Sequence, residues 1–201
     1  GCDAEQGTVA MTKALQTSYE ISAAAWLPQE LAAASEVGYV KQAGMSVAGI
    51  RVEGPGPSVE YRCAELRKQL SAFGETEELH GHNSAGFWRE VRDVRPFAET
   101  DDDRVVWKLS VPPQSGAGLA NEIARALGGE FYLDWGGGLV WLAVPETGAG
   151  GNVAIRAAAA GPGGHATLIR APAELRSAVP VFQPQVQGLA RLSQRLKESF
   201  D

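Results

Sequence analysis

The sequence has few cysteines, no excess of basic charge and no long apolar run. Cys2 and Cys63 are the two cysteines in 201 residues, so neither a disulfide framework nor a zinc site is indicated. The 18 lysines and arginines are outnumbered by 24 acidic residues and are scattered, which disfavours a nucleic-acid-binding surface. No apolar run approaches the roughly 20 residues of a membrane-spanning helix, and no signal peptide is evident. We therefore expect no transmembrane segment and a cytoplasmic location.

Motifs of self-contained active sites are also missing. The sequence has no Gly-x-Ser-x-Gly elbow, no nucleotide-binding glycine motif between a strand and a helix, and no cysteine with a placed histidine. His80 and His82 lack a third metal ligand at helical or hairpin spacing. The acidic run at 101–103 lacks the glycine turn and distal glutamate of a calcium loop. We predict no metal site, with a polar loop at the first place and a solvated turn at the second.

The stretch 130–144 predicts a β-hairpin. Two apolar runs with β-strand alternation flank Gly136, Gly137 and Gly138, and glycine readily supplies the positive φ angles that a tight reversal needs. A phosphate-binding loop is the alternative. Such a loop leads into a helix N-terminus, however, whereas this one leads into another β-rich run. The hairpin is therefore the favoured interpretation.

Hydrophobic periodicity predicts an α+β fold in one domain, residues 1–201, with lobes of about 1–100 and 101–201. In the second lobe, the order strand, helix, hairpin, helix, strand is the βαββαβ pattern of a ferredoxin-like unit. The first lobe matches this order if one more strand precedes Gly1. We expect duplicated ferredoxin-like units that form an antiparallel sheet with helices on one face. The predicted strands are 19–27, 46–53, 75–79, 105–111, 130–135, 139–144 and 165–170, and the main helices 4–15, 58–72, 83–95, 119–127, 152–160 and 187–200.

Side-chain alternation along these strands predicts a polar face. If Trp107, Leu109 and the residues in step with them face the helices, a second set of side chains shares the opposite face. That set comprises Arg51, Lys108, Ser110, Tyr132, Asp134, His165 and Thr167. Any half-solvated sheet alternates in this way, so a ligand-facing surface and a merely solvated one both stay open.

His165 is the candidate catalytic residue on this face. It lies on a predicted strand, follows a glycine-rich loop and shares its face with Lys108 and Asp134. A histidine there would act as a proton shuttle, and Lys108 or Arg51 would hold a carboxylate. The alternative is a histidine that is hydrogen-bonded within the sheet.

Several motifs resemble one known family. They are Trp107-Lys108-Leu109-Ser110-Val111-Pro112-Pro113, Asp134-Trp135-Gly136-Gly137 and Gly163-Gly164-His165-Ala166-Thr167-Leu168-Ile169-Arg170. Four other motifs occur in the same order as in that family. They are Ile21-Ser22-Ala23-Ala24-Ala25-Trp26-Leu27-Pro28, Arg51-Val52-Glu53-Gly54, Phe87-Trp88-Arg89-Glu90-Val91-Arg92-Asp93 and Arg195-Leu196-Lys197. Together they resemble the C-terminal domain of the FAD-binding E-type subunit of glycolate oxidase, of the FAD-linked oxidase family. The resemblance covers nearly the whole chain.

The resemblance implies a substrate- and flavin-capping domain of an FAD-dependent oxidoreductase that acts on a small 2-hydroxy acid such as glycolate. FAD would be held mainly by an N-terminal FAD-binding domain that is not part of this sequence, so the isolated chain should be inactive. The open sheet would cover the flavin ring. Lys108 stands where the family often has arginine, and its point charge does not reproduce a bidentate clamp.

The resemblance also implies partners. These are companion flavoprotein and iron-sulfur subunits, which would place a cytoplasmic protein at the inner membrane surface. Two other functions stay open. One is a subunit-docking module without a catalytic role of its own, and the other is a free-standing small-ligand sensor, supported only by analogy of fold.

Overall fold

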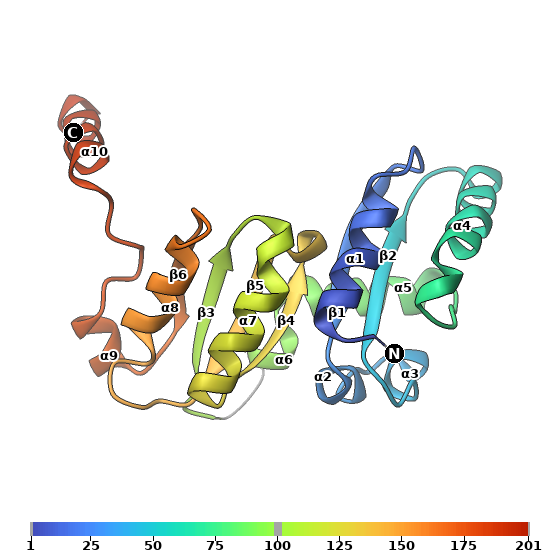
Figure 1. The fold of residues 1–201 in the computed structure, drawn as a ribbon, viewed down its shortest axis with the longest axis horizontal. Helices are drawn as coiled ribbons and strands as arrows, with labels where there is room; N and C mark the ends of the chain where they lie inside the picture. The colour runs from blue at the N-terminus through green and yellow to red at the C-terminus, as the bar shows by residue number, and fades with distance from the viewer. Residues whose placement is uncertain (1, 99–101, 201) are drawn as a thin grey trace.

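A six-stranded antiparallel sheet forms the centre of the protein. The computed structural model describes residues 2–98 and 102–200. The strand order is β2-β1-β4-β5-β3-β6, and every neighbouring pair is antiparallel (Figure 1). The strands are β1 (Ile21–Leu27), β2 (Val47–Val52), β3 (Val105–Ser110), β4 (Glu130–Asp134), β5 (Leu139–Val144) and β6 (His165–Arg170). The α+β class predicted from the sequence is confirmed.

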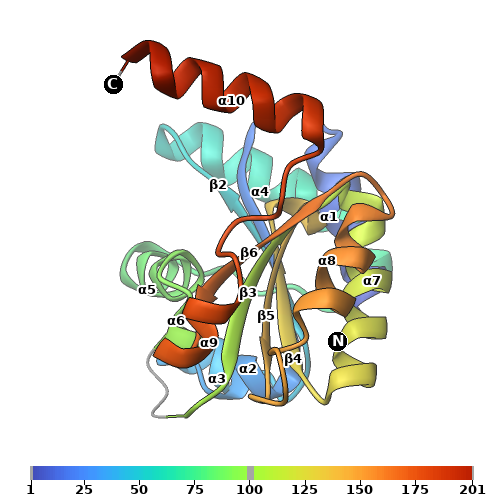
Figure 2. The same cartoon turned by 90° about the vertical axis from the view of Figure 1, so that its left-hand side faces the viewer.

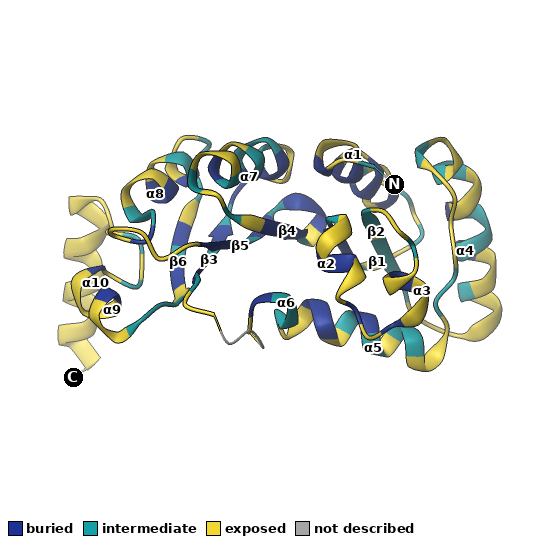
Figure 3. Cartoon of the chain, turned by 90° about the horizontal axis from the view of Figure 1, so that it is seen from below, coloured by how far each residue is buried: buried dark blue, intermediate teal, exposed yellow. Residues whose placement is uncertain are grey.

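Helices from both halves of the chain cover one face of this sheet. They are α1 (Ala4–Leu15), α7 (Pro113–Leu127) and α8 (Asn152–Ala160), while α4 (Gly56–Leu70) lies beyond β2 (Figures 1 and 3). Trp107, Leu109, Leu133 and Leu168 point toward this layer and are almost fully buried, as the alternation predicts. Each strand therefore contributes alternate residues to this core.

The prediction that helices cover one face alone is wrong. α5 (Gly81–Arg92) and α6 (Arg95–Ala98) lie across the opposite face (Figure 3). Phe87 and Phe97 of these helices belong to a second core cluster, together with Val106, Tyr132 and Ala143 of the sheet. The physical reason is that α5 has an apolar stripe of its own, which has to be buried against another element.

The helix α5 is also held by a buried carboxylate. Glu90 accepts hydrogen bonds from the Ser35 hydroxyl at 2.6 Å and from the backbone N–H of Glu36 at 2.8 Å. These partners lie between the short helices α2 (Gln29–Ala33) and α3 (Gly38–Lys41). A buried charge is tolerated where hydrogen bonds satisfy it, so this contact fixes the position of α5 on the sheet.

The two halves of the chain meet where β1 pairs with β4. One register pair, Trp26 with Leu133, joins the two strands. The Trp26 ring lies 5.8 Å from that of Phe131, measured between centroids. Both core clusters contain residues from both halves, so the sheet is continuous and the halves share their cores.

Residues 75–79, predicted as a weak strand, form no regular secondary structure. A strand requires a neighbour that supplies backbone hydrogen bonds, and no described residue pairs with this segment. The first half therefore contributes β1 and β2 to the sheet.

The remaining helical segments are η2 (Trp135–Gly137) in the loop between β4 and β5, η1 (Ser71–Phe73), α9 (Ala173–Ala178) and α10 (Gln187–Phe200). The last of these stands apart from the body and buries no residue (Figures 1 and 2). In the described part of the chain, no helix combines the length and the apolar character needed to cross a membrane.

The predicted hairpin is confirmed as β4 and β5. Gly136 and Gly137 in its loop have φ angles of 65° and 100°, which favour glycine. The loop leads into β5, so the phosphate-loop alternative lacks its helix. The loop also presses on α7: a Cβ added to Gly116 would lie 2.0 Å from the carbonyl oxygen of Gly137.

We predict that Gly116→Ala lowers the free energy of unfolding by about 1–3 kcal/mol, because the new methyl group has no room against the hairpin backbone. Gly118→Ala in the same helix is the control. No atom lies within 4 Å of the position that its Cβ would take. It should be neutral or stabilising by about 0.5–1 kcal/mol, because alanine favours a helix interior. Urea unfolding measures both, and equal effects of the two changes would contradict the close approach.

Candidate functional site

A pocket of about 770 Å³ lies between α5 and the face of the sheet that α5 crosses. β1 and β2 border it on one side, and the β4–β5 hairpin borders it on the other. Its charged and aromatic lining residues are Arg51, Trp88, Arg89, Arg92, Lys108, Asp134, Trp135 and Trp141. Both halves of the chain therefore contribute to one site at the place where they meet.

Lys108 occupies the second-half wall of this pocket. It lies on β3 directly opposite Trp141 of β5, and its Nζ is 5.8 Å from the centres of the Trp135 and Trp141 rings. No described acidic residue forms an ion pair with it. An ammonium group between two indole rings is stabilised by their π-electrons while it keeps its positive charge. Lys108 is therefore available to an anion that enters the pocket.

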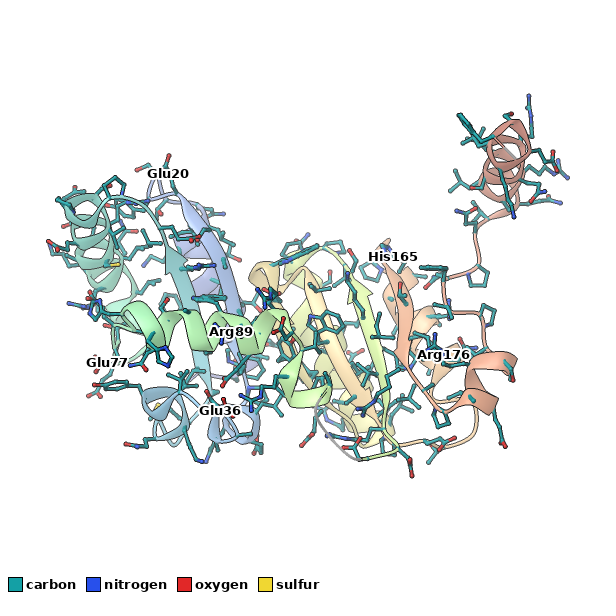
Figure 4. All side chains as sticks on the ribbon, turned by 180° about the vertical axis from the view of Figure 1, so that it is seen from behind. Glu20, Glu36, Glu77, Arg89, His165 and Arg176 are labelled. Carbon is teal, nitrogen blue, oxygen red and sulfur yellow. The ribbon has the colours of Figure 1, made fainter. Side chains whose placement is uncertain are left out.

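Three arginines add to the positive charge. Arg51 of β2 forms an ion pair with Glu53 at 2.9 Å, and Arg92 of α5 forms one with Asp93 at 2.7 Å. Arg89 makes neither a hydrogen bond nor an ion pair with another described residue. It is exposed and lies on α5 in the middle of the face shown in Figure 4. Four cations thus line a pocket whose carboxylate is Asp134.

Asp134 closes the hairpin side of the pocket. One of its carboxylate oxygens, Oδ1, accepts a hydrogen bond from the backbone N–H of Trp135 at 2.7 Å. Burial raises the pKa of Asp134, because a low-dielectric environment disfavours the charged form, and the Trp135 N–H partly opposes this. Asp134 shares its face with Lys108, as the alternation predicts.

Trp135 has an unusual conformation. Its φ angle is 52°, in a region that few residues other than glycine adopt, and its side chain is 64% exposed. An exposed indole in a strained backbone conformation gains little from burial. Such strain is often found at ligand-binding positions, so Trp135 joins the candidate site residues.

The structure separates the other predicted site residues from this pocket. His165 is exposed on β6, directly opposite Ser110 of β3. It is a diagonal neighbour of Lys108 across the two strands, a relation that places such residues about 7–8 Å apart. Figure 4 shows His165 at the end of β6, away from Arg89. Neither His165 nor Ser110 lines the pocket.

Tyr132 requires a correction. It lies on the predicted face but has no exposed surface, and its hydroxyl donates a hydrogen bond to the carbonyl oxygen of Val91 at 2.9 Å. Burial and the nearby charge of Asp134 raise its pKa above the ordinary range. The cause is α5, which covers this part of the sheet. Tyr132 therefore fixes α5 and does not contact a ligand.

The sequence interpretation missed Arg89, Arg92 and Trp88 as site residues. They share one face of α5 because residues three, four and seven apart lie on one side of a helix, and Ala85 begins that row. The helical spacing of these residues can be read from the sequence. Their place in the pocket cannot, because nothing in the sequence shows that α5 packs against the polar face.

A small anion with a carboxylate or similar group fits this arrangement. Lys108 and Arg89 supply charge without an internal ion pair, and the indole rings provide flat apolar walls. In the described ranges, no group of three or more histidine, cysteine, aspartate or glutamate side chains is arranged to hold a metal ion. Asp101 of the acidic run lies outside the described residues, whereas Asp102 pairs with Arg104 and Arg170.

Comparisons of this chain with protein-family models, with curated proteins and with solved structures found no match. A function for the chain therefore has to be inferred from the chemistry of this pocket.

We predict that Asp134→Asn becomes more stable relative to the unchanged protein as the pH rises above 3.8, the ordinary pKa of an aspartate. A raised folded-state pKa means that Asp134 contributes its full stability below that pH and loses it as the pH rises through the raised value. Asparagine does not ionise, so the variant does not lose this stability as the pH rises. Urea unfolding from about pH 3 to about pH 7 measures the difference.

Asp93→Asn is the control with the opposite sign. Hydrogen bonds from Arg92 lower the pKa of Asp93, so its contribution to stability is present above 3.8 and is lost as the pH falls through the lowered value. Asp93→Asn should therefore lose stability, relative to the unchanged protein, as the pH rises. A trend of the same sign in both variants would contradict the burial of Asp134.

Proposed function

We propose that this chain is the substrate- and flavin-capping domain of an FAD-linked 2-hydroxy acid oxidase of the glycolate oxidase type. The observation that carries the proposal is Lys108, a cation between Trp135 and Trp141 in a pocket that also contains Arg51 and Arg89. A 2-hydroxy acid such as glycolate is a small anion of matching charge. Its carboxylate accepts hydrogen bonds from an ammonium or guanidinium group.

The residues of the chain would divide the work between them. Lys108 and Arg89 bind the carboxylate and fix its orientation, and Arg51 adds positive charge from β2. Trp135 and Trp141 exclude water beside the bound acid, which strengthens these charged interactions. His165 remains the predicted proton carrier from the edge of the same face, and Ser110 opposite it stays a predicted substrate-facing residue.

FAD would be held by a separate FAD-binding domain. The glycine-rich loop between β5 and α8 provides no cradle for a diphosphate, because a Cβ at Gly150 would lie 2.8 Å from Leu175 and one at Gly151 would lie 2.7 Å from Leu127. These glycines are explained by packing. Bound FAD would supply the hydride acceptor, and this chain would position the acid and cover the flavin ring.

The proposal includes duplicated ferredoxin-like units. Its support in the second half is the order β4-β5-β3-β6, with α7 connecting β3 to β4 and α8 connecting β5 to β6. In the first half, α1, β1, β2 and α4 follow in the order of α7, β4, β5 and α8. The pairing of β1 with β4 relates the two units across the middle of the sheet.

Hydroxy acid binding by the pocket tests this proposal. We predict that Lys108→Gln weakens glycolate binding about tenfold or more, because a hydrogen bond to a charged group contributes about 1.5 kcal/mol or more. Lys108→Arg should keep the affinity, since arginine also binds carboxylates. NMR titration of the chain with glycolate measures the dissociation constants.

Lys41→Gln is the matched control, because Lys41 is exposed on α3 and does not line the pocket. It should bind glycolate as the unchanged protein does. Equal affinities of the Lys108→Gln and Lys41→Gln variants would refute the carboxylate site. Oxidation of glycolate by the chain alone with added FAD would refute the division of work between two domains.

The subunit-docking alternative has one observation in its favour. Leu189, Leu192 and Leu196 are each at least 53% exposed, and Phe200 is 87% exposed, along one side of α10. A companion subunit would cover this stripe. We predict that deletion of residues 187–201 abolishes assembly with companion subunits and leaves glycolate binding unchanged, as measured by co-purification and the NMR titration. Retained assembly would count against docking through α10.

A further inference from the structure

An apolar groove runs along the outer edge of β2, with a volume of about 820 Å³. One wall is β2 itself, and the other is the segment 74–80, which forms no strand. Residues of α4 line one side of the groove between these walls, and residues of α3 and α5 line the opposite side. Figure 1 shows β2 at the end of the sheet with α4 beyond it. The apolar side chains along the groove include Tyr39, Met45, Ile50, Val59, Leu70 and Leu79.

The two edges of the sheet differ in whether their outward-facing backbone groups are hydrogen-bonded. At the β6 edge, the N–H of Leu168 donates to the carbonyl of Val181 at 2.9 Å, and the N–H of Ala166 donates to the Gln183 side chain at 2.9 Å. At the β2 edge, no described residue outside β1 hydrogen-bonds to the backbone of Val47–Val52. An uncovered edge offers a row of donors and acceptors to an added strand.

The second half of the chain shows what occupies the corresponding place. There β5 pairs with β4 on one side and with β3 on the other, and β6 lies beyond β3. In the duplicated arrangement proposed above, β2 corresponds to β5, α4 to α8 and the segment 74–80 to β6. The groove is then the counterpart of β3.

The start of α1 fixes the direction of such a strand. Cys2 lines the groove, and its carbonyl accepts hydrogen bonds from the Ser46 hydroxyl, just before β2, and from Trp26. In the second half, the N–H of Val111 donates to the carbonyl of Gly138, just before β5, at 3.0 Å. Cys2 stands two residues ahead of α1, as Val111 stands two residues ahead of α7.

The charge of the groove indicates the character of the strand. Glu53, Glu60, Glu75, Glu77 and Glu78 border it. Arg51 pairs with Glu53, and Arg67 and His80 pair with Glu78. Glu60, Glu75 and Glu77 form no ion pair with a described residue. A strand with basic residues between its apolar ones is complementary to this rim.

We propose that the groove receives a β-strand of about six residues, apolar at alternate positions and basic between them, which runs antiparallel to β2 and joins α1 through Cys2. The strand would complete the first unit as β3 completes the second. This inference rests on the duplicated arrangement of the proposed function and uses no ligand of the carboxylate pocket, although Arg51 and Trp88 line both the groove and the pocket.

The test places a copy of residues 104–109 directly before Gly1, so that Gly1 takes the sequence place of Ser110. Hydrogen exchange of the β2 amides is the measurement. The extension should slow exchange at the outward-facing amides of residues 47–52 about tenfold or more, because they gain hydrogen-bond partners. In a Cys2→Ser background, alkylation of Cys63, which lines the groove, should slow as well.

The control is the same extension with proline at its second and fourth positions. Proline cannot donate to the sheet, so this extension should give no protection. A strand that is covalently joined to the chain has an effective concentration in about the millimolar range. The same six residues supplied as a free peptide should therefore protect β2 only at millimolar peptide concentration. If the extended chain does not fold, titration of the unextended chain with the free peptide tests the proposal instead.

Three results would overturn the proposal. They are no protection by either the extension or the peptide, equal protection by the proline control, and tight binding of the peptide at low micromolar concentration, which would assign the groove to a separate partner. Titration of the same extended protein with glycolate measures ligand binding by the pocket in a separate experiment. If β2 is protected in the extended protein and neither this protein nor the unextended chain binds glycolate, the proposed function alone is refuted.

Discussion

The pairing of β1 with β4 is the constraint on which the rest of the structure depends. A single register pair joins the two strands, which is too little hydrogen bonding to hold two lobes together. The joint is stable because core clusters on both faces of the sheet contain residues from both halves. On the side opposite α1 and α7, α5 supplies that second layer. Apolar burial on both faces therefore makes the two halves into one body.

The pocket is a consequence of this joint. Arg51 comes from the first half, Lys108 and Trp141 come from the second, and Arg89 comes from the helix that crosses between them. Neither half alone would bring these groups together. The buried Glu90 and the Tyr132 hydroxyl hold α5 at the place where its basic face looks into the pocket. Residues that contact no ligand thus determine the geometry of the site.

The charge of the pocket opposes that of the whole protein. The chain has a formal net charge of -6, yet four cations and one carboxylate line the pocket. Gathering cations in this way is unfavourable unless each is compensated. Arg51 and Arg92 have acidic partners, and indole rings stabilise Lys108. What remains uncompensated attracts an anion, which is the physical basis for the carboxylate ligand that we propose.

The sequence by itself determined the main helices, the six strands of the sheet and, for β2 and the strands of the second half, the side of the sheet to which their residues point. In β1 the irregularity between Ile21 and Ala23 shifts the alternation, so Trp26 packs with Trp107 and Leu27 faces α5. Alternation of period two placed Lys108, Asp134 and Arg51 on one face, and the structure brings all three into one pocket. Only the tertiary structure decided which part of that face stays open. α5 buries Tyr132 and leaves Lys108 accessible, whereas residues 75–79 form no strand because no neighbour pairs with them. Local periodicity encodes the direction of a side chain, but long-range packing decides what lies in front of it.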